Sequence, residues 1–234
     1  MKNQSLILYH GTDARILSMS KEERTSYFAD VDLALDYLWT IWEPLCQKTM
    51  IRELRWPNGE LKGTFPISFL ESRKQQFIDA GKEILYYNLY EKVSMADWTR
   101  QGASLYQYGS LYVSMSKDSA SDYARRSFAG GERGLIVYRM LEGIDFLGIS
   151  LGNPNEMMAK AIQRVKSFAE AKQPEPVVVT IGNVDPHDLL SEGGRPADEH
   201  IKLAHDVQKH GIQADFSFRY IKDIDLSLFP VEHI

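Results

Sequence analysis

The stretch that most constrains the fold is an alternating apolar run followed directly by a helix start. Residues 110–114 alternate in polarity, which predicts a short strand with Tyr112 on the side away from the apolar residues. Ser116 or Asp118 can cap the helix that follows, on which Tyr123 shares a face with two alanines. Because strand and helix are adjacent, we expect both tyrosines over one cleft, where two rings would suit a flat ligand.

A second short strand lies near the N-terminus and ends in a polar tripeptide. Leu6–Tyr9 is an unbroken apolar run, and His10, Gly11 and Thr12 follow it. A histidine at a strand end can project into a cleft, and glycine lets a ligand approach the backbone. Taken alone, this tripeptide would be read as a histidine tethering a turn, with Gly11 providing backbone freedom.

Together the two stretches resemble the ADP-ribosyltransferases of the diphtheria-toxin and poly(ADP-ribose) polymerase branch. That family opens with a strand ending in Tyr/Trp-His-Gly-Thr/Ser and continues with Gly-x-x-Tyr, a turn and Ser-Ala-x-x-Tyr. The matching residues here are His10, Gly11, Thr12, Gly109, Tyr112, Ser119, Ala120 and Tyr123. The resemblance implies an α+β fold, a split antiparallel β-sandwich with the cleft between its two sheets.

The resemblance also implies NAD as the substrate and a role for each matching residue. Tyr112 and Tyr123 would sandwich the cationic nicotinamide ring, whose charge favours aromatic faces. Gly11 would bind the nicotinamide amide through its backbone with help from Ser119, and His10 would hold a ribose hydroxyl. Thr12 would complete the NAD-binding set, which is listed in full as His10, Gly11, Thr12, Tyr112, Ser119 and Tyr123. No metal is expected.

The family closes with a catalytic acid, for which the chain offers two candidates. Asp215 begins an alternating run to residue 221 and takes the place of the family's glutamate. Its side chain is one methylene shorter, and a misplacement of about 1 Å can cost about 100-fold in rate. Glu175, before the β-branched strand expected at residues 177–181, is the second candidate. The alternatives are a solvent-facing aspartate at a strand start and a loop glutamate between prolines.

A rival copy of the tyrosine pattern occurs earlier, at Tyr27, Ala34 and Tyr37. We prefer Tyr112, because Gly109 precedes it and a strand is expected at residues 135–140, as in the toxin branch. On that choice, Tyr27 and Tyr37 are interpreted as residues that pack a helix and a core.

Elsewhere we expect one domain over residues 1–234 that carries a mostly helical insertion at about 33–103, where apolar residues recur at helical spacing. Residues 156–171 and 201–210 are also predicted to be helical. The three histidines at 200, 205 and 210 are five residues apart, so each is rotated about 140° from the last beyond one turn. They therefore do not form a metal-binding face.

Composition narrows the class of protein. The net charge of −5 gives no broad footprint for nucleic acid, and the single Cys46 excludes an intrachain disulfide framework. No apolar run reaches the ~18 residues of a membrane span, and the first residues do not read as a signal peptide. We expect a soluble, cytoplasmic protein folded in a reducing compartment, with delivery into another cell as a toxin or effector left open.

Three functions are compatible with these residues. The first is an NAD-dependent mono-ADP-ribosyltransferase with an unknown acceptor. The second is a catalytically weak relative that binds NAD or ADP-ribose, or serves as an interaction module, as the aspartate and the helical insertion suggest. The third is a tRNA 2′-phosphotransferase-like enzyme or an NAD glycohydrolase on the same scaffold, although the clustered Arg and His of a phosphotransferase are not seen.

Overall fold

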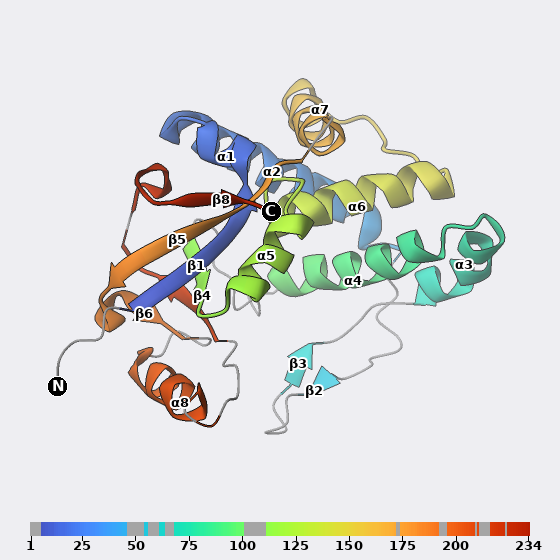
Figure 1. The fold of residues 1–234 in the computed structure, drawn as a ribbon. Helices are drawn as coiled ribbons and strands as arrows, with labels where there is room; N and C mark the ends of the chain where they lie inside the picture. Colours follow the sequence, from blue (N-terminus) through green and yellow to red (C-terminus); the bar gives the residue numbers. More distant parts are fainter. Residues whose placement is uncertain are drawn as a thin grey trace. The chain divides into compact units, whose positions relative to one another are not determined.

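The chain divides into two compact units. The computed structural model describes residues 6–45, 54–55, 61–63, 68–100, 111–171, 174–191, 196–208, 210, 216–222 and 224–234. The sheet unit comprises residues 1–22, 105–131 and 171–234, and the helical unit comprises residues 23–104 and 132–170. Figure 1 labels the helices and most of the strands.

The sheet unit is built on one six-stranded antiparallel sheet with the order β6-β7-β4-β1-β5-β8. Its strands are β1 (Leu6–Asp13), β4 (Leu111–Ser114), β5 (Pro176–Val184), β6 (Leu189–Leu190), β7 (Ser217–Tyr220) and β8 (Val231–His233). Its helices are α1 (Ala14–Ser18), α5 (Lys117–Arg126) and α8 (Asp198–Gln208), with 3-10 turns at Pro186–Asp188 and Leu226–Leu228. The predicted α+β class is confirmed, and the strand predicted at residues 177–181 is the core of β5.

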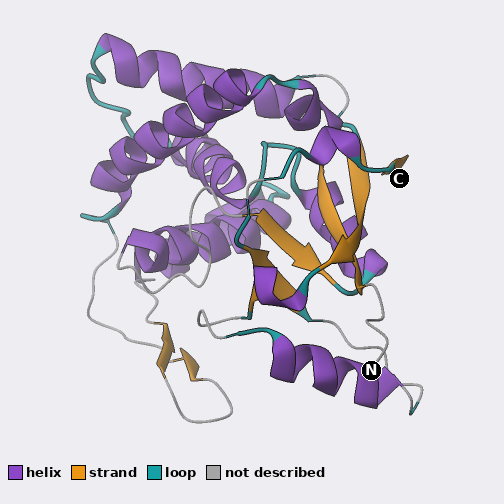
Figure 2. Ribbon diagram, turned by 90° about the vertical axis from the view of Figure 1, so that its left-hand side faces the viewer, coloured by secondary structure: helices purple, strands orange, loops and turns teal. Residues whose placement is uncertain are grey.

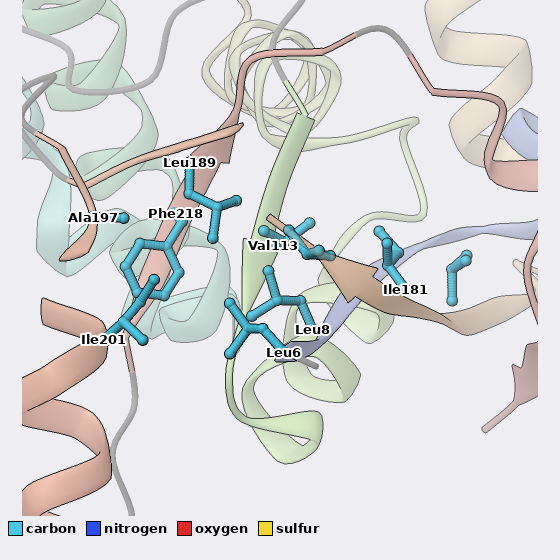
Figure 3. Close-up of a cluster of buried hydrophobic side chains, with 10 residues drawn as sticks. Leu6, Leu8, Val113, Ile181, Leu189, Ala197, Ile201 and Phe218 are labelled. Carbon is cyan, nitrogen blue, oxygen red and sulfur yellow. The ribbon is translucent and has the colours of Figure 1, made fainter. Parts of the chain in front are cut away.

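The core of this unit lies on one face of the sheet, as Figure 3 shows. Leu8 of β1, Val113 of β4 and Phe218 of β7 are buried together there, and Ile201 of α8 packs against the same cluster. Side chains alternate along a strand, so Gly11, three residues after Leu8, faces the opposite side.

Helix α5 covers that opposite side and begins as predicted. Ser116 is its N-cap, and the Ser116 hydroxyl oxygen accepts a hydrogen bond from the Ser119 main-chain N–H at 3.2 Å. A Cβ added to Gly11 would lie 1.8 Å from the Ala120 carbonyl oxygen. Only glycine therefore allows the α5 backbone to pack this closely onto β1.

The helical unit holds most of α2 (Lys21–Trp42), with α3 (Ser68–Asp79), α4 (Glu83–Arg100), α6 (Glu132–Leu147), α7 (Glu156–Glu170) and the short pair β2 (Leu54–Arg55) and β3 (Leu61–Gly63). Figure 2 shows helices in purple and strands in orange. Three helices meet at Gly143 of α6, where an added Cβ would lie 2.5 Å from a Leu89 methyl of α4 and 3.1 Å from Trp42 of α2.

The strand expected at residues 135–140 is wrong, because these residues lie within α6. Gly134, Leu135, Ile136 and Val137 are all buried, and buried positions continue at helical spacing to Ile144. A short apolar run that is buried all round does not distinguish a strand from a core helix. No helix in the described part of the chain is both long and apolar enough to cross a bilayer.

Candidate functional site

The site predicted from the sequence centres on the point where β1 and β4 separate. Among the described residues, these two strands pair at Tyr9 and Ser114 alone. By contrast, β1 pairs with β5 from Leu6 to Asp13 with one irregularity between Leu6 and Leu8, and β4 pairs with β7 at each of its residues. The sheet is therefore split between β1 and β4 beyond the Tyr9–Ser114 pair, and we call this feature the β1–β4 divergence.

The His10 side chain bridges the divergence. Its ring Nδ1 lies 2.7 Å from the carbonyl oxygen of Tyr112, a residue 102 positions away in the chain. A carbonyl oxygen only accepts hydrogen bonds, so Nδ1 carries the proton and donates it. Burial lowers the pKa of His10, and the hydrogen bond to Tyr112 opposes this only in part. The ring is thus neutral, and on this half-buried residue Nε2 has a lone pair without a partner among the described residues.

Both predicted tyrosines belong to the side of the sheet that α5 covers. Tyr112 alternates with Val113, which is in the core cluster on the other face, so Tyr112 shares the face of Gly11. Tyr123 lies on α5 and is 41% exposed. A Cβ at Gly131 would lie 3.9 Å from its hydroxyl oxygen. His10 is two residues after Leu8 on β1, so its side chain lies on the core face of the sheet. From that face it bonds to the Tyr112 main chain at the β1–β4 divergence.

The remaining residues of the predicted NAD-binding set are Gly11, Thr12 and Ser119. Gly11 is buried beneath α5, which is a reason for a glycine that sequence reasoning missed. Thr12 is buried at the end of β1. Ser119 is half-buried in the first turn of α5, and its N–H is capped by Ser116. All three lie on β1 and α5, two elements in direct contact.

Of the two candidate acids, only Glu175 lies within the described residues. Asp215 lies outside the described residues, while its neighbour Phe216 accepts a hydrogen bond from the Met115 N–H at 3.0 Å. Glu175 is exposed, and its carbonyl oxygen is held by the Ala14 N–H at 2.8 Å. Ala14 is four residues from His10, about 13 Å at the rise of a strand. The Glu175 main chain is therefore held beside Ala14, at the end of β1.

The rival tyrosines lie in a helix of the other unit. Tyr27 is on α2 and is fully buried, with its ring centroid 4.8 Å from that of Phe168 on α7. The Arg164 guanidinium lies 5.6 Å from the Tyr27 centroid. The Tyr37 hydroxyl donates to the carbonyl oxygen of Leu151. Tyr27 is thus a core residue of the helical unit, and Tyr37 is half-buried on the same helix.

One pair of residues beside the site was not singled out from the sequence. Asp13 is 1% exposed and caps α1, and its carboxylate accepts hydrogen bonds from Arg15 Nε at 2.8 Å and Nη2 at 2.7 Å. Arg15 Nη2 also donates to the Phe128 carbonyl oxygen at 2.8 Å. An aspartate directly before a helix is a capping signal, but no local pattern points to Phe128.

In the described part of the chain, no three His, Cys, Asp or Glu side chains are grouped as metal ligands. No protein-family model matches this chain, and no curated protein or solved structure matches it. The function must therefore be argued from the residues and geometry of the sheet unit.

Proposed function

We propose that the sheet unit is an NAD-dependent mono-ADP-ribosyltransferase that cleaves the nicotinamide–ribose bond and transfers ADP-ribose to an acceptor. One observation supports this most strongly: the hydrogen bond from His10 Nδ1 to the Tyr112 carbonyl oxygen at the β1–β4 divergence. It joins the two stretches that resemble the family, although 102 positions separate them in the chain. The bond also orients the His10 ring, so that Nε2 is available to a ligand.

The proposed binding mode follows from the chemistry of these groups. Tyr112 and Tyr123 hold the nicotinamide ring between them, and the negative faces of their rings attract its positive charge. Neutral His10 accepts a hydrogen bond at Nε2 from a ribose hydroxyl, which a protonated ring could not do. The backbone beside Gly11 binds the amide of the same ring, aided by Ser119.

The proposed reaction breaks the bond between the ribose C1′ and the nicotinamide nitrogen. The electron pair of that bond leaves with nicotinamide, which becomes neutral, and positive charge develops on the ribose. A carboxylate stabilises this charge, after which the acceptor attacks C1′ and loses a proton. We assign the carboxylate to Asp215, which takes the place of the family's glutamate, and keep Glu175 as the alternative acid.

A second candidate function is a module that binds NAD or ADP-ribose with little catalysis. The observation that favours it is the aspartate at position 215, which has a shorter reach than glutamate. NAD glycohydrolase activity is the same chemistry with water as the acceptor. The products formed from NAD distinguish the binding module and the glycohydrolase from the transferase.

The test incubates the purified protein with NAD, with and without cell lysate, and measures nicotinamide and ADP-ribosyl adducts by mass spectrometry. Asp215→Ala should abolish nicotinamide release while calorimetric NAD affinity stays nearly unchanged, because its charge acts on the transition state. Asp215→Glu should keep or raise the rate, and Glu175→Ala is the matched control that should leave it unchanged.

Tyr112→Ala should weaken NAD binding by about 1 kcal/mol or more, through lost stacking and buried area. NAD binding without nicotinamide release would identify the binding module. Release of nicotinamide with free ADP-ribose and no adduct would identify the glycohydrolase. A folded parent protein that shows no NAD binding in calorimetry would refute the proposal.

A further inference from the structure

We propose that Arg15 is a positioning residue that holds Tyr123 in place through the turn that follows α5. The inference rests on the proposed function only in naming nicotinamide as the ring that Tyr123 contacts. Its physical basis is a chain of contacts from the end of β1 to the end of α5, all within the sheet unit.

The first part of this chain is the buried fork between Arg15 and Asp13. The Asp13 carboxylate accepts from the Arg15 main-chain N–H at 2.9 Å as well as from Nε and Nη2. A two-pronged arginine–carboxylate pair fixes the plane of the guanidinium as well as its position. Asp13 lies three residues after His10 on β1, so the fork is anchored to the strand that carries the candidate histidine.

The second part is the Ser127–Gly131 turn. Arg15 Nη2 donates to the Phe128 carbonyl oxygen at 2.8 Å, 113 positions away in the chain. The Ser127 hydroxyl donates to the Tyr123 carbonyl oxygen at 2.8 Å, and the Gly130 N–H donates to the Ser127 carbonyl oxygen at 2.8 Å. The turn is thus bonded to Arg15 at one residue and to Tyr123 at another.

The third part is the close approach of the turn to the Tyr123 ring. Gly131 has a φ of 117°, a conformation that glycine alone adopts readily. A Cβ there would lie 3.9 Å from the Tyr123 hydroxyl oxygen, so the turn runs alongside the tip of this ring. The neighbouring Ala129 is fully buried, which anchors the turn between Arg15 and Tyr123. A shift of the Phe128 carbonyl would therefore move the groups that contact Tyr123.

The test compares Arg15→Lys, Arg15→Met and a control variant, Arg125→Met. Lysine lacks the forked guanidinium that reaches both Asp13 and Phe128. It keeps a positive charge opposite Asp13, so Arg15→Lys should fold even if Arg15→Met does not. Arg125 lies on α5 too, but it forms an exposed ion pair with Asp122, 3.3 Å apart. Amide hydrogen exchange of peptides covering residues 120–131 is the readout that needs no ligand.

We expect faster exchange at residues 120–131 in Arg15→Lys, unchanged exchange in β5, and parent-like exchange in Arg125→Met. NAD affinity of Arg15→Lys should fall about threefold to tenfold, the range of one aromatic contact. Affinity for ADP-ribose, which lacks nicotinamide, should stay at the parent value. In a Tyr123→Ala background, Arg15→Lys should cause no further loss of NAD affinity, because both changes act on one contact.

Unchanged exchange at residues 120–131 in both Arg15 variants would overturn the inference. An equal loss of NAD and ADP-ribose affinity would overturn it too, because it would indicate a general loss of structure. If the parent binds no NAD, the proposed function is wrong, and hydrogen exchange alone decides whether Arg15 positions Tyr123.

Discussion

Two regions of this chain carry a tyrosine, a small residue and a second tyrosine at similar spacing, and the fold uses them differently. In the sheet unit, Tyr112 is half-buried on a strand and Tyr123 is 41% exposed on α5. In the helical unit, Tyr27 is fully buried on α2 and the Tyr37 hydroxyl is bonded to a main-chain carbonyl. The pattern is the same, but Tyr27 has no exposed ring surface that a ligand could contact, whereas Tyr112 and Tyr123 both do.

The two units also pack their critical glycines differently. Gly11 in the sheet unit lies against main-chain atoms of Ala120 and Ala124. Gly143 in the helical unit lies against the side chains of Leu89 and Trp42. Side-chain ends can rotate away from an added methyl group, whereas a helix backbone moves only as a whole. We therefore expect the sheet unit to tolerate less change at its glycine.

The largest effect should come from Tyr27→Ala. Removing a fully buried aromatic ring should lower the free energy of unfolding by about 3–5 kcal/mol, measured by urea denaturation. The half-buried Tyr112→Ala should cost less stability but should lose NAD affinity. If folded Tyr27→Ala loses NAD affinity and Tyr112→Ala does not, the comparison is reversed and the site belongs to the rival pattern.

An intermediate effect is expected at the two glycines. Gly11→Ala should lower the free energy of unfolding by about 3 kcal/mol, because the added methyl meets the Ala120 carbonyl. Gly143→Ala should cost about 1 kcal/mol, since Leu89 can adjust and alanine favours a helix more than glycine does. The two variants are compared by urea denaturation, and equal losses would show that the packing distinction is wrong.

The smallest expected effect is the contribution of His10 to the pH dependence of the free energy of unfolding. Burial lowers the pKa of His10 from 6.5 in the folded protein, so the unfolded chain takes up its proton first as the pH falls. The free energy of unfolding should therefore decrease as the pH drops below 6.5, down to the folded pKa. His10→Gln should remove this part of the pH dependence, and the exposed His187→Gln is the control. Identical profiles for the parent and His10→Gln would count against a buried neutral His10.

Much of the local structure could be predicted because short-range rules govern it. The Ser116 cap, the β5 strand and α7 (Glu156–Glu170) follow from capping chemistry, β-branched residues and helical periodicity. The run at residues 135–140 could not be assigned in this way. Four consecutive residues of α6, 134–137, are buried, and this removes the periodic signal that separates a helix from a strand.

The parts of the candidate site follow from the local sequence, but the contacts between them do not. The sequence alone determined which residues form its parts: a strand ending in His10, a strand bearing Tyr112 and a capped helix bearing Tyr123. Tertiary structure decided that β1 and β4 separate after one pair, that His10 bonds to Tyr112, and that Arg15 reaches Phe128. These contacts join residues more than 100 positions apart. The close packing of α5 on β1 that Gly11 permits is likewise a tertiary contact. No local propensity encodes such contacts, because they depend on the packing of whole elements.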